Sequence, residues 1–400
     1  MPYLQATEIC VQKSRLAVDK TEQRRQMRKL LDWCKKEVVL TIAILLAVIS
    51  AFLIHPDKEY TTYIDFRTLA ILFCLMAVMA GLQKIGLFRF VAEKLLEKIS
   101  HIRGLIFILI MLCFFSSMLI TNDVALITFV PFTFIVLKMI LGERCEELIV
   151  PVIVMQTIAA NLGSMLTPIG NPQNLYLYGK TTMNFVSFIV FMLPYTAIAF
   201  VVLAGWCLIF RYKGEKKVEL TIDQNAEIAQ YKKQLLIYGI LFVLCILTVA
   251  HVIAYLVTLG VVLIVVFFLD RHVLKEVDYA LLLTFVGFFV FIGNMGRVPA
   301  FNTFIQNIID GNEVLTSVVA SQFMSNVPAA LLLSGFTSQY ELLIVGTNLG
   351  GLGTLIASMA SLISFKYIGK EYGHLKGKYM LYFTAANILF LIILFGYTLI

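Results

Sequence analysis

Apolar stretches of about 17 to 25 residues recur along most of the sequence, and they constrain the fold more than any motif. A helix of this length, rising 1.5 Å per residue, crosses the ~30 Å hydrocarbon core of a bilayer. With 60% hydrophobic and only 14% charged residues, the chain cannot cover a globule with polar side chains. The sequence lacks the short alternating patterns that are typical of the strands of a membrane barrel. It therefore predicts an all-α polytopic membrane protein.

The predicted spans include two that Gly and Pro interrupt, at 149–178 and 341–365. The uninterrupted spans are predicted at about 38–54, 66–83, 185–210, 234–250, 252–270, 279–296 and 379–398. Segments 84–100 and, more weakly, 299–310 place apolar residues on one helical face, which predicts helices that lie in the membrane interface. The aromatic stripe of the span at 279–296 is predicted to face lipid; its residues are Phe285, Phe288, Phe289 and Phe291.

The Lys and Arg residues divide unequally between the two sides of this topology. If the N-terminus is cytoplasmic, only four of the 32 fall outside, namely Lys58, Arg67, Lys180 and Arg297. This asymmetry predicts a multi-pass protein of the cytoplasmic membrane, with the N-terminus inside and the C-terminus external. It also explains the net charge of +7 without nucleic acid. The basic residues 1–36 contain no signal-peptide h-region and are predicted to form a cytoplasmic segment, with membrane lipid as a partner.

Two matches within the sequence indicate an internal repeat. Ser117, Thr121, Asn122 and Ala125 fall on Ser321, Ser325, Asn326 and Ala329, and ANLGSMLTPIG (160–170) falls on TNLGGLGTLIA (347–357). The predicted halves are 37–210 and 252–400, joined by a cytoplasmic linker and one span at 211–251. Because that single span separates them, the second half starts from the opposite side, and the repeat is predicted to be inverted. Inverted repeats with interrupted helices are typical of secondary transporters.

The segments 104–137 and 313–337 are predicted to be re-entrant hairpins rather than pairs of spans. From Glu313 to Ser325 a helix rises only ~18 Å, which is too short for a ~30 Å core. Each hairpin carries polar residues at its tip, Thr121-Asn122-Asp123 in the first and Ser325-Asn326-Val327 in the second. Irregular backbone at this depth is tolerated only where protein or a wet cavity surrounds it.

The tips and the broken spans both offer groups that bind ions. Free helix ends and neutral side-chain oxygens can hold a desolvated cation beside an anion, and Asp123 can bind Na⁺ or accept a proton. The Gly-rich breaks free backbone carbonyls that a cation can satisfy. We therefore predict two pseudo-symmetric cation sites, where each tip meets the broken span of its own half. Two plainer interpretations stay open: the tip residues are only helix caps, and the glycines only allow close helix packing.

These motifs resemble the ion transporter superfamily, which includes divalent anion:sodium symporters, citrate transporters, arsenite-efflux permeases and one class of bacterial sodium/proton antiporters. The resemblance covers roughly 38 to 398 and implies two inverted repeats, an elevator-like movement and a homodimer. It implies ion-binding residues at Thr121, Asn122, Asp123, Asn161, Gly163, Ser325, Asn326, Asn348 and Gly350. It implies substrate contacts at Asn122, Thr167, Asn171, Asn326, Val327 and Thr354. In the symporters both tips usually read Ser-Asn-Thr, whereas this sequence has Asp123 and Val327 at the third position. The Asn-Asp pair of the first tip resembles the arsenite and antiporter branches more closely.

The sequence thus predicts a secondary transporter that moves a small carboxylate or oxyanion and is coupled to Na⁺ or H⁺, with no other cofactor. A sodium/proton antiporter that uses Asp123, and an arsenite-type efflux permease, are the nearest alternatives. A channel would conduct without coupling. Since no hydrolase motif or phosphate-binding loop occurs, an enzyme is not predicted.

Overall fold

The computed structural model describes residues 37–97, 99, 101–210 and 231–399, and the regular elements in these ranges are all helices. Within this described part, seven helical segments are long and apolar enough to cross a membrane, which fits a polytopic membrane protein. The predicted basic segment 1–36 and residues 211–230 of the predicted linker lie outside the described residues.

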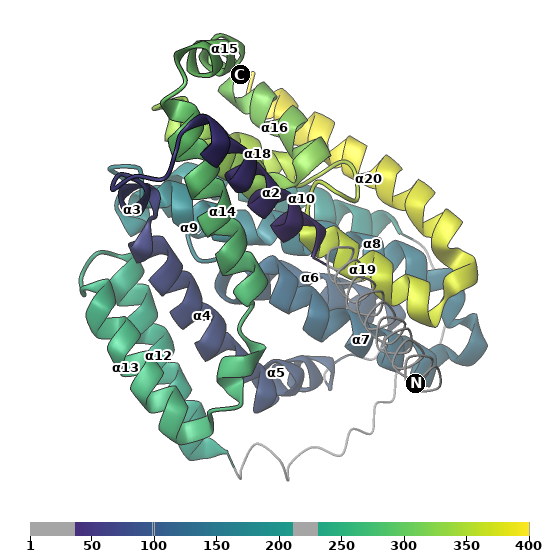
Figure 1. Cartoon of the computed structure of the whole chain (residues 1–400). Coiled ribbons are helices and arrows are strands. Elements are labelled where there is room, and N and C mark those ends of the chain that lie inside the picture. Colours follow the sequence, from purple (N-terminus) through teal and green to yellow (C-terminus); the bar gives the residue numbers. More distant parts are fainter. Residues whose placement is uncertain (1–36, 98, 100, 211–230, 400) are drawn as a thin grey trace, which may run out of the picture.

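One group of helices, here called the scaffold group, lies on one side of the molecule (Figure 1). Its members are α2 (Val38–Leu53), α3 (Tyr60–Tyr63), α4 (Phe66–Lys84), α12 (Lys232–Val249), α13 (Tyr255–Asp270), η3 (Val273–Glu276) and α14 (Tyr279–Gly296). Helix α2 packs along α14, and α4 packs against α12 and α13. Two members begin at aspartate caps: Asp65 Oδ1 accepts from the Thr68 N–H, and Asp278 Oδ1 accepts from the Leu281 N–H.

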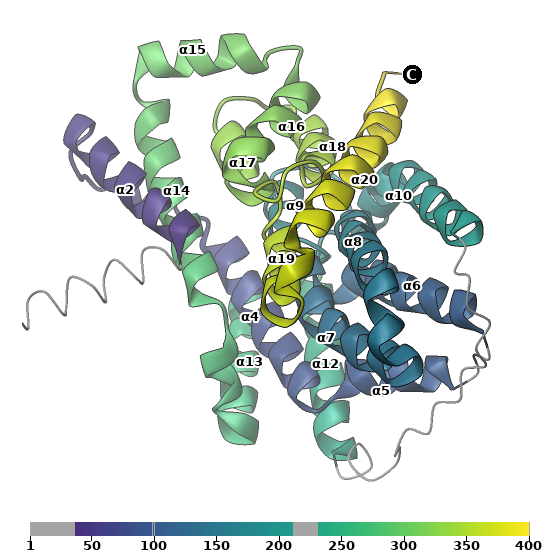
Figure 2. The same ribbon diagram turned by 90° about the vertical axis from the view of Figure 1, so that its right-hand side faces the viewer.

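The other group, here called the hairpin group, contains both polar-tipped segments and both interrupted spans. Its first part is α6 (Ile102–Ile120), α7 (Asn122–Leu141), η1 (Gly142–Cys145), α8 (Glu146–Gly163), η2 (Ser164–Leu166), α9 (Pro172–Tyr178) and α10 (Phe185–Ile209). Its second part is α16 (Glu313–Met324), α17 (Asn326–Leu333), α18 (Tyr340–Gly350), α19 (Met359–Glu371), η4 (Gly373–Leu375) and α20 (Lys376–Tyr397). Helices α17 and α18 contact α9, and α19 contacts α7 and α8, so the two parts are packed together, as Figure 2 shows.

Helices α5 (Leu87–Leu96) and α15 (Pro299–Ile309) lie at opposite edges of the molecule, as both views show (Figures 1 and 2). They are the two segments in which the sequence predicts amphipathic interfacial helices. Their opposite placement is what interfacial helices on the two sides of one bilayer require.

Both polar-tipped segments form helical hairpins. Helices α16 and α17, of 12 and 8 residues, rise ~18 and ~12 Å and are too short to cross a ~30 Å core, in agreement with a re-entrant hairpin. Helices α6 and α7 have 19 and 20 residues and are long enough to cross. The re-entrant depth of the first hairpin therefore stays a prediction.

The two interrupted spans are confirmed as broken helices. Helix α8 ends at Gly163 and α9 begins at Pro172, while α18 ends at Gly350 and α19 begins at Met359. A Cβ atom at Gly170 would overlap the carbonyl oxygen of Ser164, so the first break requires glycine at this position.

The prediction that the aromatic stripe of α14 faces lipid is wrong for three of its four residues. Phe285, Phe288 and Phe289 are buried, with exposed fractions of 0%, 3% and 4%. The rings of Phe285 and Phe289 lie 6.1 and 5.5 Å from that of Tyr176 in α9. The stripe therefore joins the scaffold group to a broken helix instead of contacting lipid.

An ion-pair cluster outside the spans predicts how the stability of the fold depends on pH. Arg297 Nη1 donates to Asp57 Oδ2 at 2.7 Å and also pairs with Glu59, which ties α14 to the loop before α3. The hydrogen bond from Arg297 holds the pKa of Asp57 below its ordinary value of 3.8. A carboxyl whose pKa is lowered in the folded state stabilises the fold at pH values above its ordinary pKa. This stabilisation is lost as the pH falls through the folded-state pKa. We expect Asp57→Asn to lower the melting temperature slightly and equally at pH 5 and pH 8; unequal shifts would contradict this assignment.

Candidate functional site

Both hairpins turn at a non-glycine residue with a strained backbone. Thr121 has φ 68° and ψ 151°, and Ser325 has φ 75° and ψ 155°. This region of backbone space is almost restricted to glycine and costs about 1–3 kcal/mol for other residues. Two equivalent tips that carry the same strain indicate that the turn conformation serves function rather than stability.

Each tip contacts the broken helix of its own half through matching hydrogen bonds. The Asn122 N–H donates to Gly170 O at 3.3 Å, and the Asn326 N–H donates to Ala357 O at 3.0 Å. These are the positions that the internal sequence match pairs with each other. The predicted meeting of each tip with its own break is thus confirmed.

Thr167 and Thr354, which the internal sequence match pairs with each other, contact the two hairpins in the same way. Thr167 Oγ1 donates to Met118 O, and Thr354 Oγ1 donates to Gln322 O at 3.1 Å. Thr167 is buried and Thr354 is exposed. Both hydroxyl protons are therefore held by backbone carbonyls.

Gly163 and Gly350 lie where a hairpin helix crosses a broken helix. A Cβ atom at Gly163 would overlap the carbonyl oxygen of Phe114, and one at Gly350 would lie 2.5 Å from Ser321 Oγ. Both glycines thus permit close helix packing, which is the plainer interpretation that the sequence left open. The Gly350 carbonyl is also occupied, since it accepts from Gln322 Nε2 at 3.1 Å.

Asn161 joins the first tip to the second broken helix. Its Oδ1 accepts from Asn122 Nδ2 at 2.9 Å and from Ser358 Oγ at 3.0 Å. Its Nδ2 donates to Ser361 Oγ at 3.4 Å and to Gly351 O at 3.5 Å. A single buried side chain thus holds both halves of the site together.

Asn348, the sequence match of Asn161, makes the reciprocal contacts. Its Oδ1 accepts from Asn171 Nδ2 at 3.3 Å, and its Nδ2 donates to Asn174 Oδ1 at 2.6 Å. If the sequence match of 160–170 with 347–357 is extended at the same offset, Asn171 and Asn174 are paired with Ser358 and Ser361. Each asparagine therefore reaches the same two positions of the opposite break.

The second tip departs from this symmetry. Ser325 Oγ donates to Asn326 Oδ1 at 3.4 Å, and Val327 is buried. Within the described residues no hydrogen bond joins Asn326 to Asn348, whereas Asn122 is bonded to Asn161. The structure therefore forms the predicted tip-to-break asparagine pair in the first half alone.

A cavity of about 490 Å³ opens beside the first tip, between α4, α7, α9 and η3. Thr121, Asp123 and Asn171 line its inner part, and the exposed residues His272 and Glu276 line its outer part. The buried oxygens Asp123 Oδ1 and Asn171 Oδ1 have no hydrogen-bond partner among the described residues. Leaving a buried carboxylate without a partner is costly, so a cation or a proton is the fitting complement here.

The model of the citrate transporter family, CitMHS, matches residues 27–340. The chain belongs to the citrate transporter family. The uncharacterized transporter MJ0456 of Methanocaldococcus jannaschii is 32% identical over 363 residues, which are 90% of this chain and 95% of that protein. The inner membrane protein YbiR of Escherichia coli is 31% identical over 323 residues, 80% of this chain and 84% of that protein.

The silicon efflux transporter LSI3 of Oryza sativa subsp. japonica is 31% identical over 141 residues, which are 35% of this chain and 28% of that protein. The names of the family and of these relatives indicate that this citrate transporter family member is a membrane transporter rather than an enzyme. The family match also confirms the resemblance to the ion transporter superfamily that the motifs of the tips and broken spans indicated.

Sequence reasoning missed several polar residues of this citrate transporter family member. Gln322 caps the second break, because its amide donates to Gly350 O and Leu352 O and accepts from the Thr354 N–H at 2.9 Å. Gln173, at the start of α9, is 1% exposed, and neither polar atom of its amide has a partner in the described part of the chain. The signal in the sequence was that polar residues lie inside or beside the two breaks. Extending the internal match to Ser358 and Ser361 would have shown it.

We predict that Asn161→Ala destabilises this family member by about 2–3 kcal/mol, because it leaves buried groups of Asn122, Ser358 and Ser361 unsatisfied. The matched control is Asn302→Ala, which removes a solvent-exposed hydrogen bond to Gly296 O and is expected to change stability by less than ~0.5 kcal/mol. Thermal unfolding of the purified variants measures both. Equal effects of the two substitutions would show that Asn161 does not hold the site together.

Proposed function

We propose that this chain is a secondary active transporter of a small anion, a carboxylate or an inorganic oxyanion, coupled to Na⁺ or H⁺. The observation that carries the proposal is the cavity beside the first tip, where Asp123 Oδ1 and Asn171 Oδ1 are buried without partners among the described residues. A monovalent cation at Asp123 neutralises the carboxylate, so an anion bound beside it meets the cation instead of an uncompensated negative charge.

The proposed cation ligands belong to the two tips and the asparagines that meet at the breaks. The first site uses Thr121, Asn122, Asp123 and Asn161, and the second uses Ser325, Asn326 and Asn348. Gly163 and Gly350 act in this proposal as spacers, since a Cβ atom at either position would meet the neighbouring hairpin helix. The proposed substrate contacts are Asn122, Thr167, Asn171, Asn326, Val327 and Thr354, and the unpartnered amide of Gln173 is added to them.

We further propose that the two halves are inverted repeats and that the hairpin group moves as a block against the scaffold group. The exchanged contacts of Asn161 and Asn348 support a pseudo-two-fold relation, because each reaches the matched positions of the opposite half. The cavity lies between α4 of the scaffold group and α7 and α9 of the hairpin group, where such a movement would open it. In the proposed transporter, two copies pair through the scaffold group.

The proposed membrane is the cytoplasmic membrane, with the N-terminus inside and the C-terminus outside. The charge asymmetry of the sequence supports this orientation. Lys84 and His272, on the predicted inner side, line the outer part of the cavity. The described conformation would then be open to the cytoplasm.

A sodium/proton antiporter is the second candidate, and the unpartnered carboxyl of Asp123 favours it. One buried carboxylate with neutral oxygens around it is sufficient for alternating Na⁺ and H⁺ binding. The silicon efflux transporter among the relatives favours an efflux permease as a further candidate.

Reconstitution into proteoliposomes tests the proposal. With an inward Na⁺ or proton gradient, we expect the uptake of one labelled anion from a panel of citrate, succinate, phosphate and arsenite, and no uptake without the gradient. Na⁺/H⁺ exchange that requires no anion would establish the antiporter instead. Gradient-independent flux at a rate far above carrier turnover would establish a channel.

A further inference from the structure

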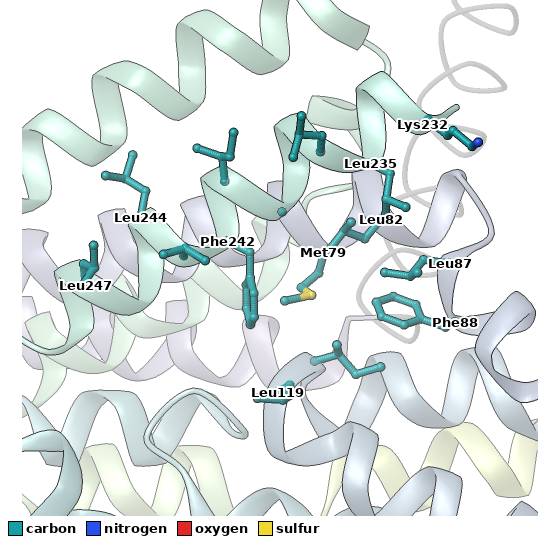
Figure 3. Close-up of a pocket in the computed structure, with 15 residues that line it drawn as sticks. Met79, Leu82, Leu87, Phe88, Leu119, Lys232, Leu235, Phe242, Leu244 and Leu247 are labelled. Atoms are coloured by element: carbon teal, nitrogen blue, oxygen red, sulfur yellow. The ribbon is translucent and has the colours of Figure 1, made fainter. Parts of the chain in front are cut away.

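A second cavity, of about 800 Å³, lies between α12 and the α4, α5 and α6 helices (Figure 3). Except for Lys232, the residues that line it are apolar or glycine. We call it the apolar groove. A concave apolar space of this size excludes water, and in a bilayer the molecules available to fill it are lipid chains.

Charge distinguishes one end of the apolar groove from the other. Figure 3 shows Lys232 at one end and Leu247 at the opposite end. The 15 residue steps from Lys232 to Leu247 rise ~22 Å along α12, which is more than half of a ~30 Å hydrocarbon core. Lys232 is exposed, and among the described residues no acidic side chain pairs with it. A molecule with an anionic head and a long apolar chain matches this distribution.

The apolar groove shares a wall with the cavity beside the first tip. Met79, Leu119 and Ile120 line both spaces. Ile120 is followed directly by Thr121, the strained residue of the tip. An occupant of the apolar groove therefore contacts the last turn of α6 and side chains that also line the cavity beside the first tip.

We propose that the apolar groove binds one anionic phospholipid, whose acyl chain lies along α12 and whose phosphate pairs with Lys232. The ammonium group supplies the charge that selects an anionic headgroup, and the apolar lining holds the chain. Bound in this way, the lipid packs against the side chains that separate the apolar groove from the cavity beside the first tip.

Native mass spectrometry of the whole protein tests the headgroup. The purified chain is incubated with dioleoyl phosphatidylglycerol or dioleoyl phosphatidylcholine, which carry the same acyl chains, and the retained lipids are counted. We expect one phosphatidylglycerol to be retained in preference to phosphatidylcholine. Lys232→Gln should reduce this preference about fivefold, the factor that ~1 kcal/mol per Lys corresponds to. The matched control, Lys233→Gln, alters the adjacent exposed lysine, which does not line the groove, and should leave the preference unchanged.

A second variant tests the place of the acyl chain. A Cβ atom at Gly239 meets no atom within 4 Å, so Gly239→Phe is expected to fill the groove without disturbing α12. It should lower the retention of both lipids at least tenfold. Gly260→Phe on α13 is the matched control, since Gly260 is equally unobstructed and lies outside the groove. Thermal melting checks that both variants fold.

Equal retention of the two lipids by the wild type, or retention that Gly239→Phe leaves intact, would overturn the proposal. The readout is bound lipid and needs no transported substrate. Its failure is therefore distinguishable from failure of the proposed transport function.

Discussion

Asp123→Asn is expected to abolish the stabilisation of the protein by Na⁺ and to reduce cation-driven uptake at least about 100-fold. The substitution keeps the shape of the side chain and removes the charge from the buried oxygen that has no partner. Losing one partner of a buried charge pair typically costs 2–5 kcal/mol. Because Na⁺ and a proton compete for the same carboxylate, stabilisation of the wild type by Na⁺ should increase from pH 5 to pH 9.

The measurement is the melting temperature from pH 5 to pH 9, with and without Na⁺. Lys84, His272, Glu276 and Asp278 also face this cavity, so a control must separate them from Asp123. Glu276→Gln makes the same change of charge at an exposed position of the same cavity and should preserve the Na⁺ response. The Asp57 and Arg297 pair does not interfere, because Asp57 titrates below this pH range.

Two other outcomes would change the mechanism. A wild type that responds to pH but not to Na⁺, with the response lost in Asp123→Asn, would show that protons are the coupling ion. A variant that keeps every response of the wild type would show that Asp123 only stabilises the start of α7. That result would remove the carboxylate from the proposed coupling.

Gly163→Ala is expected to destabilise the protein by ~3 kcal/mol or more, the upper end of the cost of overpacking. The added Cβ would overlap a backbone oxygen, that of Phe114, so α6 must shift relative to α8. Gly350→Ala should cost less, because its nearest obstacles are Ser321 Oγ at 2.5 Å and Ser321 Cβ at 2.7 Å, whereas the Cβ at Gly163 would lie 2.0 Å from a backbone oxygen. Thermal unfolding of the purified variants measures the order of the two effects.

Gly239→Ala is the matched control for these two substitutions. It also adds one methyl group to a helix, but nothing lies within 4 Å of the new Cβ. Helix propensity then favours alanine by up to ~1 kcal/mol, so stability should stay equal or rise. If Gly163→Ala were as stable as this control, close packing of α6 on α8 would not explain the glycine.

Much of the fold could be predicted because its signals are local. Long apolar runs placed the spans, and Gly163, Pro168, Gly170 and Pro172 located the first break between α8 and α9. The polar residues Thr121 and Ser325 marked both hairpin tips. The error at Phe285 has the same origin, since an aromatic residue in a span is equally compatible with lipid and with a packed helix.

The candidate site could be predicted only in part. Asn122 and Asn161 were assigned to one site in the first half and are hydrogen-bonded to each other, yet Asn161 also reaches Ser358 and Ser361 of the other half. Gln322 was missed because it lies on an ordinary helix, and its function depends on the break that it faces.

By itself, the sequence determined that this chain forms membrane-spanning helices, where those helices break and where the two polar tips lie. Hydrophobicity and the backbone preferences of Gly and Pro act within a few residues, so they can be read along the chain. Only the tertiary structure decided that Asn161 and Asn348 exchange contacts between the halves and that Asp123 faces a cavity. Those relations depend on how helices far apart in the sequence pack together, and no local preference specifies that packing.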